Sequence, residues 1–144
     1  MAIYRRLSIK ALALGALTDL GGSLLYGGIL GVAFGIYFGM QNLPENEIII
    51  RLQGLGFLIP SLLIGLGFNA LGGYVAGRIA KAHQVLHGGL VSGLSLLIAP
   101  FFWSSTPLWY GIAGVLACIP CGMLGGRFAT NSQHKPPEPG NPSA

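Results

Sequence analysis

The chain has 144 residues, of which 52% are hydrophobic and only 8% are charged, and its net charge is +4. A soluble domain of this size carries about 25% charged residues, so this composition excludes an ordinary water-soluble protein and predicts a surface that mostly contacts lipid. The basic residues stand singly at the ends of apolar runs, which excludes a phosphate-binding patch and nucleic acid as an expected partner.

The first apolar stretch, residues 11–40, exceeds the ~20 residues that a membrane helix needs. Every fourth residue in it is small except Asp19. Because helix residues four apart share a face, this stripe predicts a groove that another backbone approaches closely, as small-xxx-small patterns do in membranes. We expect its later, all-glycine half to face another helix of the bundle or a second copy of the protein. The glycines assigned to helix packing here are Gly15, Gly27, Gly31, Gly35 and Gly39.

Three more apolar stretches follow, and the predicted spans are 11–40, 50–79, 84–103 and 108–126. The second carries its own packing stripe at Gly65, Gly73 and Gly77. Residues 41–47 have the composition of a loop, and residues 130–144, rich in proline and polar side chains, predict a disordered cytoplasmic tail. We therefore expect an all-α integral membrane protein, a glycine-rich four-helix bundle formed by residues 1–129.

The basic residues also predict the orientation. With four spans, seven of the eight lysines and arginines fall on the side that holds both termini, and only Arg51 falls opposite. The positive-inside rule then places both termini in the cytoplasm.

The segment GGYVAGRIAK at 72–81, followed by HGGLVSG at 87–93, resembles a group of uncharacterised small four-span bacterial membrane proteins. In that group a Gly-Gly-aromatic-x-Ala-Gly-basic end to the second span leads into a glycine-rich third span. The resemblance covers residues 72–93. It implies a bacterial inner-membrane protein with four spans and no particular activity.

Asp19 is the only acidic residue inside a predicted span, which makes it a candidate functional residue. Asn69 lies nine residues from Arg78, the same offset as Asp19 has from Lys10, so antiparallel neighbours would bring the two side chains together. These side chains would belong to one polar layer between the helices. We interpret this layer as interhelical hydrogen bonding; the alternative is a proton or cation site. Its further members are Thr18, Ser23 and Ser92.

Two other pairs have spacings that occur at chemical sites. Cys118 and Cys121 are spaced like a redox pair, but they lie toward the predicted cytoplasmic rim and the chain has no further cysteine, so we expect small packing residues. His83 and His87 could share one face of a helix, but no third ligand is evident, so no metal site is predicted. No catalytic residue and no cofactor is expected.

These patterns leave three hypotheses. The favoured one is a non-enzymatic structural or accessory membrane component that forms a homo-oligomer or docks to another membrane protein. The alternatives are a small ion or proton channel or carrier using Asp19 and Asn69, and a membrane thiol oxidoreductase using Cys118 and Cys121. We expect four thin spans rich in small residues to leave no room for a large cavity, and hence no transport of a bulky solute.

Overall fold

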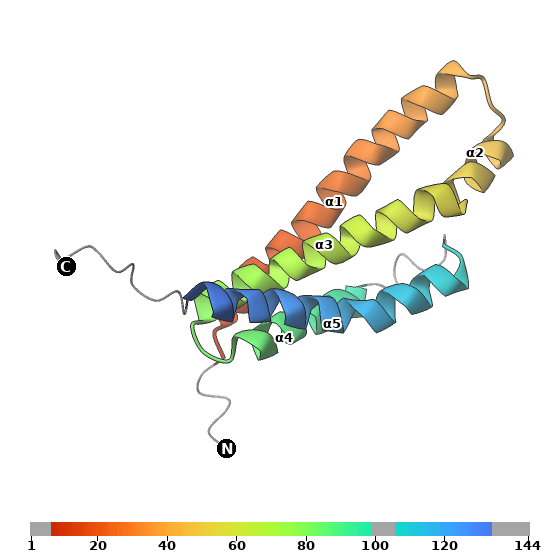
Figure 1. Ribbon diagram of the computed structural model, residues 1–144. Helices are drawn as coiled ribbons and strands as arrows, with labels where there is room; N and C mark the ends of the chain where they lie inside the picture. Colours follow the sequence, from red (N-terminus) through yellow and green to blue (C-terminus); the bar gives the residue numbers. More distant parts are fainter. Residues whose placement is uncertain (1–6, 99–105, 134–144) are drawn as a thin grey trace, which may run out of the picture.

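The computed structural model describes residues 7–98 and 106–133, and within these ranges the protein contains five helices and no strand (Figure 1). The helices are α1 (Ile9–Met40), α2 (Glu45–Leu52), α3 (Leu55–Ala80), α4 (Gln84–Ile98) and α5 (Leu108–Gln133). By length and composition, α1, α3 and α5 are long and apolar enough to cross a membrane, whereas α4 has 15 residues. The predicted all-α class is confirmed, and the three long apolar helices indicate a membrane protein.

Helix α3 is central, because it packs against α1, α4 and α5, and α4 in turn contacts α1 and α5. Helices α1, α3, α4 and α5 run in alternating directions along the chain, so that α3 and α5 run the same way (Figure 1). Helix α1 follows α3 closely at its N-terminal half and then diverges from it toward α2 (Figure 1). The packed region that positions the candidate site therefore lies toward the start of α1.

Glycines permit the close approach of helices in this packed region. A Cβ atom at Gly15 of α1 would lie only 2.7 Å from the carbonyl oxygen of Gly72 in α3. Gly73 of α3 meets the backbone of Gly122 in α5, and a Cβ at Gly77 would lie 3.3 Å from the Cα of Gly126. Direct backbone contact supplies the dispersion energy that holds helices together where lipid gives no hydrophobic drive.

The other glycines that the sequence assigned to packing have open space around them. A Cβ atom at any of them would find no other heavy atom of the described chain within 4 Å. The physical reason on α1 is its divergence from α3, which carries the later half of the stripe away from its neighbour. These positions are Gly27, Gly31, Gly35, Gly39 and Gly65.

Helix boundaries differ from the predicted elements at three places. Helix α2 begins at Glu45, inside the predicted loop of residues 41–47. The second apolar stretch is divided, because α2 ends at Leu52 and α3 begins at Leu55, with Gly54 in an extended conformation between them. Helix α5 continues to Gln133, beyond the predicted start of the tail, and the Thr130 hydroxyl donates to the carbonyl of Gly126 within that extension. The remaining tail, 134–144, and the end of the predicted third span, 99–103, lie outside the described residues.

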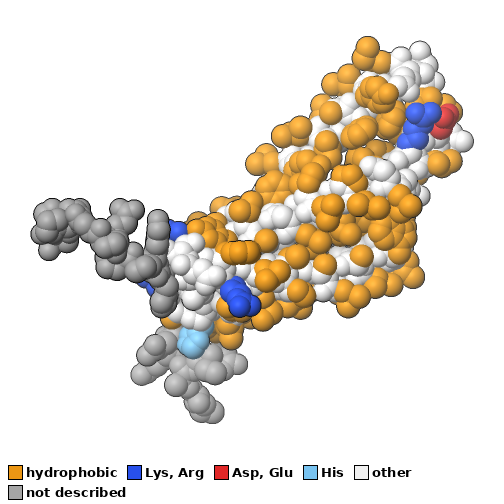
Figure 2. Space-filling model, in the orientation of Figure 1, with side chains coloured by type: hydrophobic (Ala, Val, Ile, Leu, Met, Phe, Trp, Pro, Cys, Tyr) orange, Lys and Arg blue, Asp and Glu red, His pale blue; other side chains and the backbone are white. Residues whose placement is uncertain are grey.

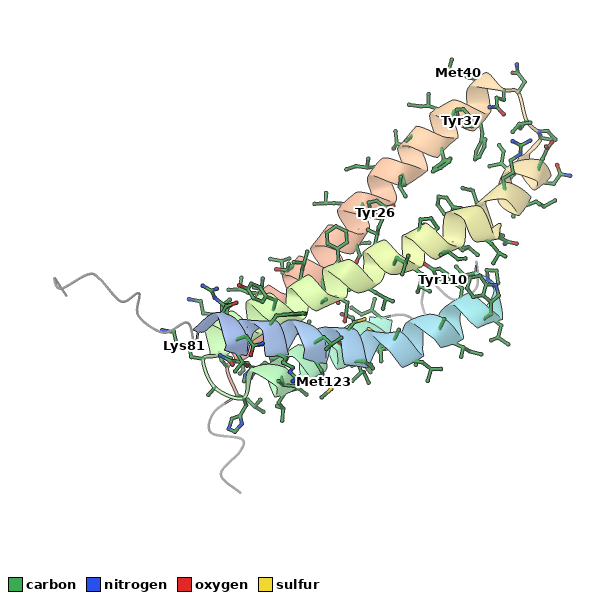
Figure 3. The ribbon with its side chains drawn as sticks, viewed as in Figure 1. Tyr26, Tyr37, Met40, Lys81, Tyr110 and Met123 are labelled. Atoms are coloured by element: carbon green, nitrogen blue, oxygen red, sulfur yellow. The ribbon has the colours of Figure 1, made fainter. Side chains whose placement is uncertain are left out.

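The distribution of side chains fits a lipid environment. Figure 2 shows hydrophobic side chains over most of the visible face, with charged groups at the two ends. At the end near α2, Arg51 pairs with Glu47 at 2.8 Å, and Lys81 lies at the opposite end (Figure 3).

Candidate functional site

A cluster of polar side chains lies where four helices meet, and we call it the Asp19 cluster. It contains Asp19 of α1, Asn69 of α3, Ser92 and Ser95 of α4, and Cys118 of α5. Asp19 is 4% exposed, Asn69 3% and Ser92 0%. Asp19 is ten residues from the start of α1, which places it about 15 Å along the helix.

Hydrogen bonds join the members into one network. The Asn69 amide donates from Nδ2 to Oδ2 of Asp19 at 2.9 Å, and its Oδ1 accepts from the Ser92 hydroxyl at 2.9 Å. The Ser95 hydroxyl donates to the same Oδ2 of Asp19 at 2.5 Å. Nδ2 of Asn69 also lies 3.3 Å from the sulfur of Cys118. Asn69 thus connects the carboxylate of α1 to α4 and α5, using both ends of its amide.

Small residues on the neighbouring helices allow these side chains to meet. A Cβ atom at Gly72 would lie 2.8 Å from the Cβ of Asp19, so any larger residue there would push α1 away from α3. A Cβ at Gly122 would collide with the Ser92 hydroxyl and would lie 3.2 Å from Oδ1 of Asn69. The glycine contacts and the polar cluster are therefore two aspects of one packing arrangement.

Asp19 has no cationic partner within the described residues. No lysine, arginine or histidine in 7–98 or 106–133 forms an ion pair with it, and the ion pair that these ranges do contain joins Arg51 to Glu47. A buried carboxylate in apolar surroundings is costly unless its charge is neutralised. Asp19 is therefore chemically suited to hold a proton or a cation.

A cavity of about 280 Å³ borders the cluster. Asp19, Asn69, Ser95 and Cys118 form its polar wall, and Ser23 also lines it. The remaining wall is mostly apolar and comes from α1, α3, α4 and α5.

A second cavity, of about 480 Å³, lies between the diverging half of α1 and the region of α2 and α3. We call it the aromatic groove, because Tyr26, Phe34, Phe38, Phe57 and Tyr110 line it together with glycines of α1. In Figure 3, Tyr26 points from α1 toward α3, and Tyr110 lies near the start of α5.

The two cavities adjoin, since four residues line both: Ser23, Ser61, Gly65 and Tyr110. The expectation that four thin helices leave no room for a large internal cavity stays a prediction, since the larger of these two cavities lies where α1 diverges from the bundle.

The structure brings together three of the five residues assigned to the polar layer, Asp19, Asn69 and Ser92, whereas the Thr18 hydroxyl donates to the carbonyl of Leu14. Ser23 borders both cavities instead. Sequence reasoning missed Ser95, and it considered Cys118 only for packing or redox chemistry. Ser95 follows Ser92 by three residues and so shares its helix face, which is the signal that could have identified it.

Within the described residues, the histidine pair and the two cysteines do not come together as a metal site. Nε2 of His87 accepts the backbone N–H of Ser8 at 3.1 Å, and its Nδ1 lies 3.1 Å from the carbonyl oxygen of His83. The described residues contain no group of three His, Cys, Asp or Glu side chains placed to hold a metal ion. The thiols of Cys118 and Cys121 are free.

Comparison with known proteins adds no family assignment. No protein-family model, curated protein or solved structure matches the chain. The resemblance of residues 72–93 to small four-span bacterial membrane proteins therefore stays a prediction.

Proposed function

We propose that the protein is a small multi-pass membrane protein that binds a proton or a small monovalent cation at Asp19 and moves it as a channel or carrier. The observation that supports this most directly is a carboxylate only 4% exposed, without a cationic partner among the described residues, beside a cavity.

Interhelical hydrogen bonding alone does not account for a carboxylate at this position. An asparagine there would have the same shape and would still accept hydrogen bonds from Asn69 and Ser95, without the cost of a charge in lipid. Oδ1 of Asp19 accepts no hydrogen bond from the described residues, so one carboxylate oxygen remains available to a ligand. A site that gains and loses positive charge needs both a group that can carry negative charge and an oxygen atom that is free to bind the ligand.

The proposed setting is a bacterial inner membrane crossed four times, with both termini in the cytoplasm. The uneven distribution of lysine and arginine supports this orientation. Helix α4 would supply most of the third span, which the sequence extends to residue 103.

The proposal is tested by reconstituting the full chain in liposomes loaded with a pH-sensitive or sodium-sensitive dye and imposing a gradient of one ion at a time. We expect the wild-type chain to dissipate the proton gradient, the sodium gradient or both. Asp19→Asn should reduce the flux to that of empty liposomes, because the amide cannot take up a proton or balance a cation.

Thr18→Ala is the matched control, since Thr18 adjoins Asp19 but its hydroxyl donates to the Leu14 carbonyl outside the cluster. Its flux should match wild type. Equal flux from wild type and Asp19→Asn would refute a role for the carboxylate.

A second candidate is an accessory component that assembles through α1. The observation that favours it is the open glycine face of its diverging half, where Gly27, Gly31, Gly35 and Gly39 meet no other part of the described chain. Gly31→Leu and Gly35→Leu should then weaken assembly in mild detergent, measured by native mass spectrometry, while Ile29→Leu should not. A wild-type chain that is monomeric under these conditions would remove this candidate.

A further inference from the structure

The joined cavities have chemically different ends. One end is the buried carboxylate of Asp19, with the Asn69 and Ser95 side chains beside it. The other end is the aromatic groove, whose rings come from α1, α3 and α5. Phe34 and Phe57, which both line the groove, contact each other edge to face with ring centroids 5.1 Å apart.

A carboxylate without a cationic partner among the described residues, in a cavity that adjoins a groove lined by aromatic rings, suits an organic cation. The carboxylate supplies the opposite charge, and the apolar surface of the rings covers the substituents of the ligand. We propose that the joined cavities bind a hydrophobic organic cation, with its charged centre near Asp19 and its apolar substituents in the aromatic groove. This inference rests on the proposed function in one respect, that Asp19 is the residue that accepts positive charge.

Two other occupants fit the cavities less well. An inorganic ion would use Asp19 but would leave the aromatic groove, which is the larger cavity, without a role. An acyl chain would fill the groove but would bring no positive charge to the carboxylate. An organic cation satisfies both ends with one molecule.

The glycines of α1 provide the width that such a ligand needs. Gly27, Gly31 and Gly35 line the groove, and a Cβ added at any of them would meet nothing within 4 Å. The stripe that predicts a helix-packing face in the sequence therefore lines a binding groove in this interpretation.

The test is isothermal titration of the full chain in lipid nanodiscs with tetraphenylphosphonium, using tetraphenylborate as a probe of the same shape and opposite charge. We expect saturable binding of the phosphonium, and none of the borate beyond its partition into empty nanodiscs. Asp19→Asn should weaken phosphonium binding by about tenfold or more, which corresponds to ~1.4 kcal/mol.

A second pair of variants keeps the test valid if Asp19→Asn does not fold. Gly31→Leu places a side chain into the groove, whereas Gly28→Leu is an equivalent change on the same helix at a position that lines neither cavity. Both positions have space for the new side chain, so we expect both variants to fold. Gly31→Leu should weaken phosphonium binding and Gly28→Leu should leave it unchanged.

The outcomes separate this inference from the proposed function. Equal phosphonium binding by wild type and both glycine variants, or equal binding of phosphonium and borate, would overturn the inference. Absent phosphonium binding together with Asp19-dependent proton or sodium flux would overturn the inference alone. Absence of both would overturn the two together.

Discussion

Asp19 and Asn69 are separated by 50 residues, yet their equal offsets from a basic residue at the membrane rim were enough to predict that they meet. The offset works because antiparallel helices share one scale of depth, set by the rise of 1.5 Å per residue. Ser95 could not be placed with the same argument, because its membership depends on the rotation of α4 about its own axis. The depth of a residue in the membrane can be predicted from the sequence, whereas the rotation of a helix about its own axis depends on its packing against neighbouring helices.

His87 is a second residue whose contacts cannot be predicted from the sequence. It is fully buried, and it accepts the N–H of Ser8, which lies 79 residues away and caps α1. From the sequence, it is only one half of a histidine pair that lacks a third metal ligand. The contact instead fixes the start of α1 against α4.

We predict that His87→Leu lowers the free energy of unfolding by about 1–3 kcal/mol, because it leaves the Ser8 N–H without its acceptor. His83→Ala is the control, since the His83 side chain is exposed and its backbone carbonyl, which alanine keeps, lies at Nδ1 of His87. Denaturant titration in detergent, followed by circular dichroism, would measure both. An equal loss in the two variants would contradict a specific role for the His87 ring.

At the scale of single helices, α1 behaves as two different segments with one sequence pattern. Gly15 makes a backbone contact with α3, while Gly31 and Gly35 border open space. A small-residue stripe shows where a backbone can approach, but it does not say which partner does. The sequence also does not predict the break between α2 and α3 at Gly54, because apolar residues continue on both sides of it.

The tight crossing of α5 with α3 and α4 gives a prediction with a matched control. Gly122→Ala should destabilise the protein by about 1–3 kcal/mol through overpacking, because the new methyl group would collide with the Ser92 hydroxyl and the Gly88 carbonyl. Gly114→Ala lies on the same helix and would meet only a Leu62 methyl group at 3.9 Å.

Gly114→Ala should therefore be neutral or slightly stabilising, given the better helix propensity of alanine. Thermal unfolding in detergent would compare the two. Similar unfolding temperatures for both variants would show that α5 does not approach α3 and α4 this closely.

For the whole molecule, composition predicts the all-α class, and three of the four predicted spans correspond to helices long and apolar enough to cross a membrane. The cavities did not follow, because they result from the divergence of α1 rather than from any local pattern. The orientation in the membrane remains a prediction from the distribution of charge.

Reporter fusions test that orientation. Fusions after Asn46 and Ser105 should report the outer side, and fusions after Lys81 and Lys135 the cytoplasm, because the lysines and arginines concentrate near the latter two positions and the N-terminus. A cytoplasmic signal after Ser105 would contradict four spans.

The central claim is that Asp19 holds an exchangeable positive charge, and infrared difference spectroscopy of the reconstituted protein tests it most directly. The chain has only four acidic residues, which makes the carboxyl region of the spectrum simple to assign. We predict a carboxyl band that changes with the sodium concentration or the pH in the wild-type chain and that is absent in Asp19→Asn. A spectrum without any such band, identical in wild type and Asp19→Asn under every condition, would contradict the claim.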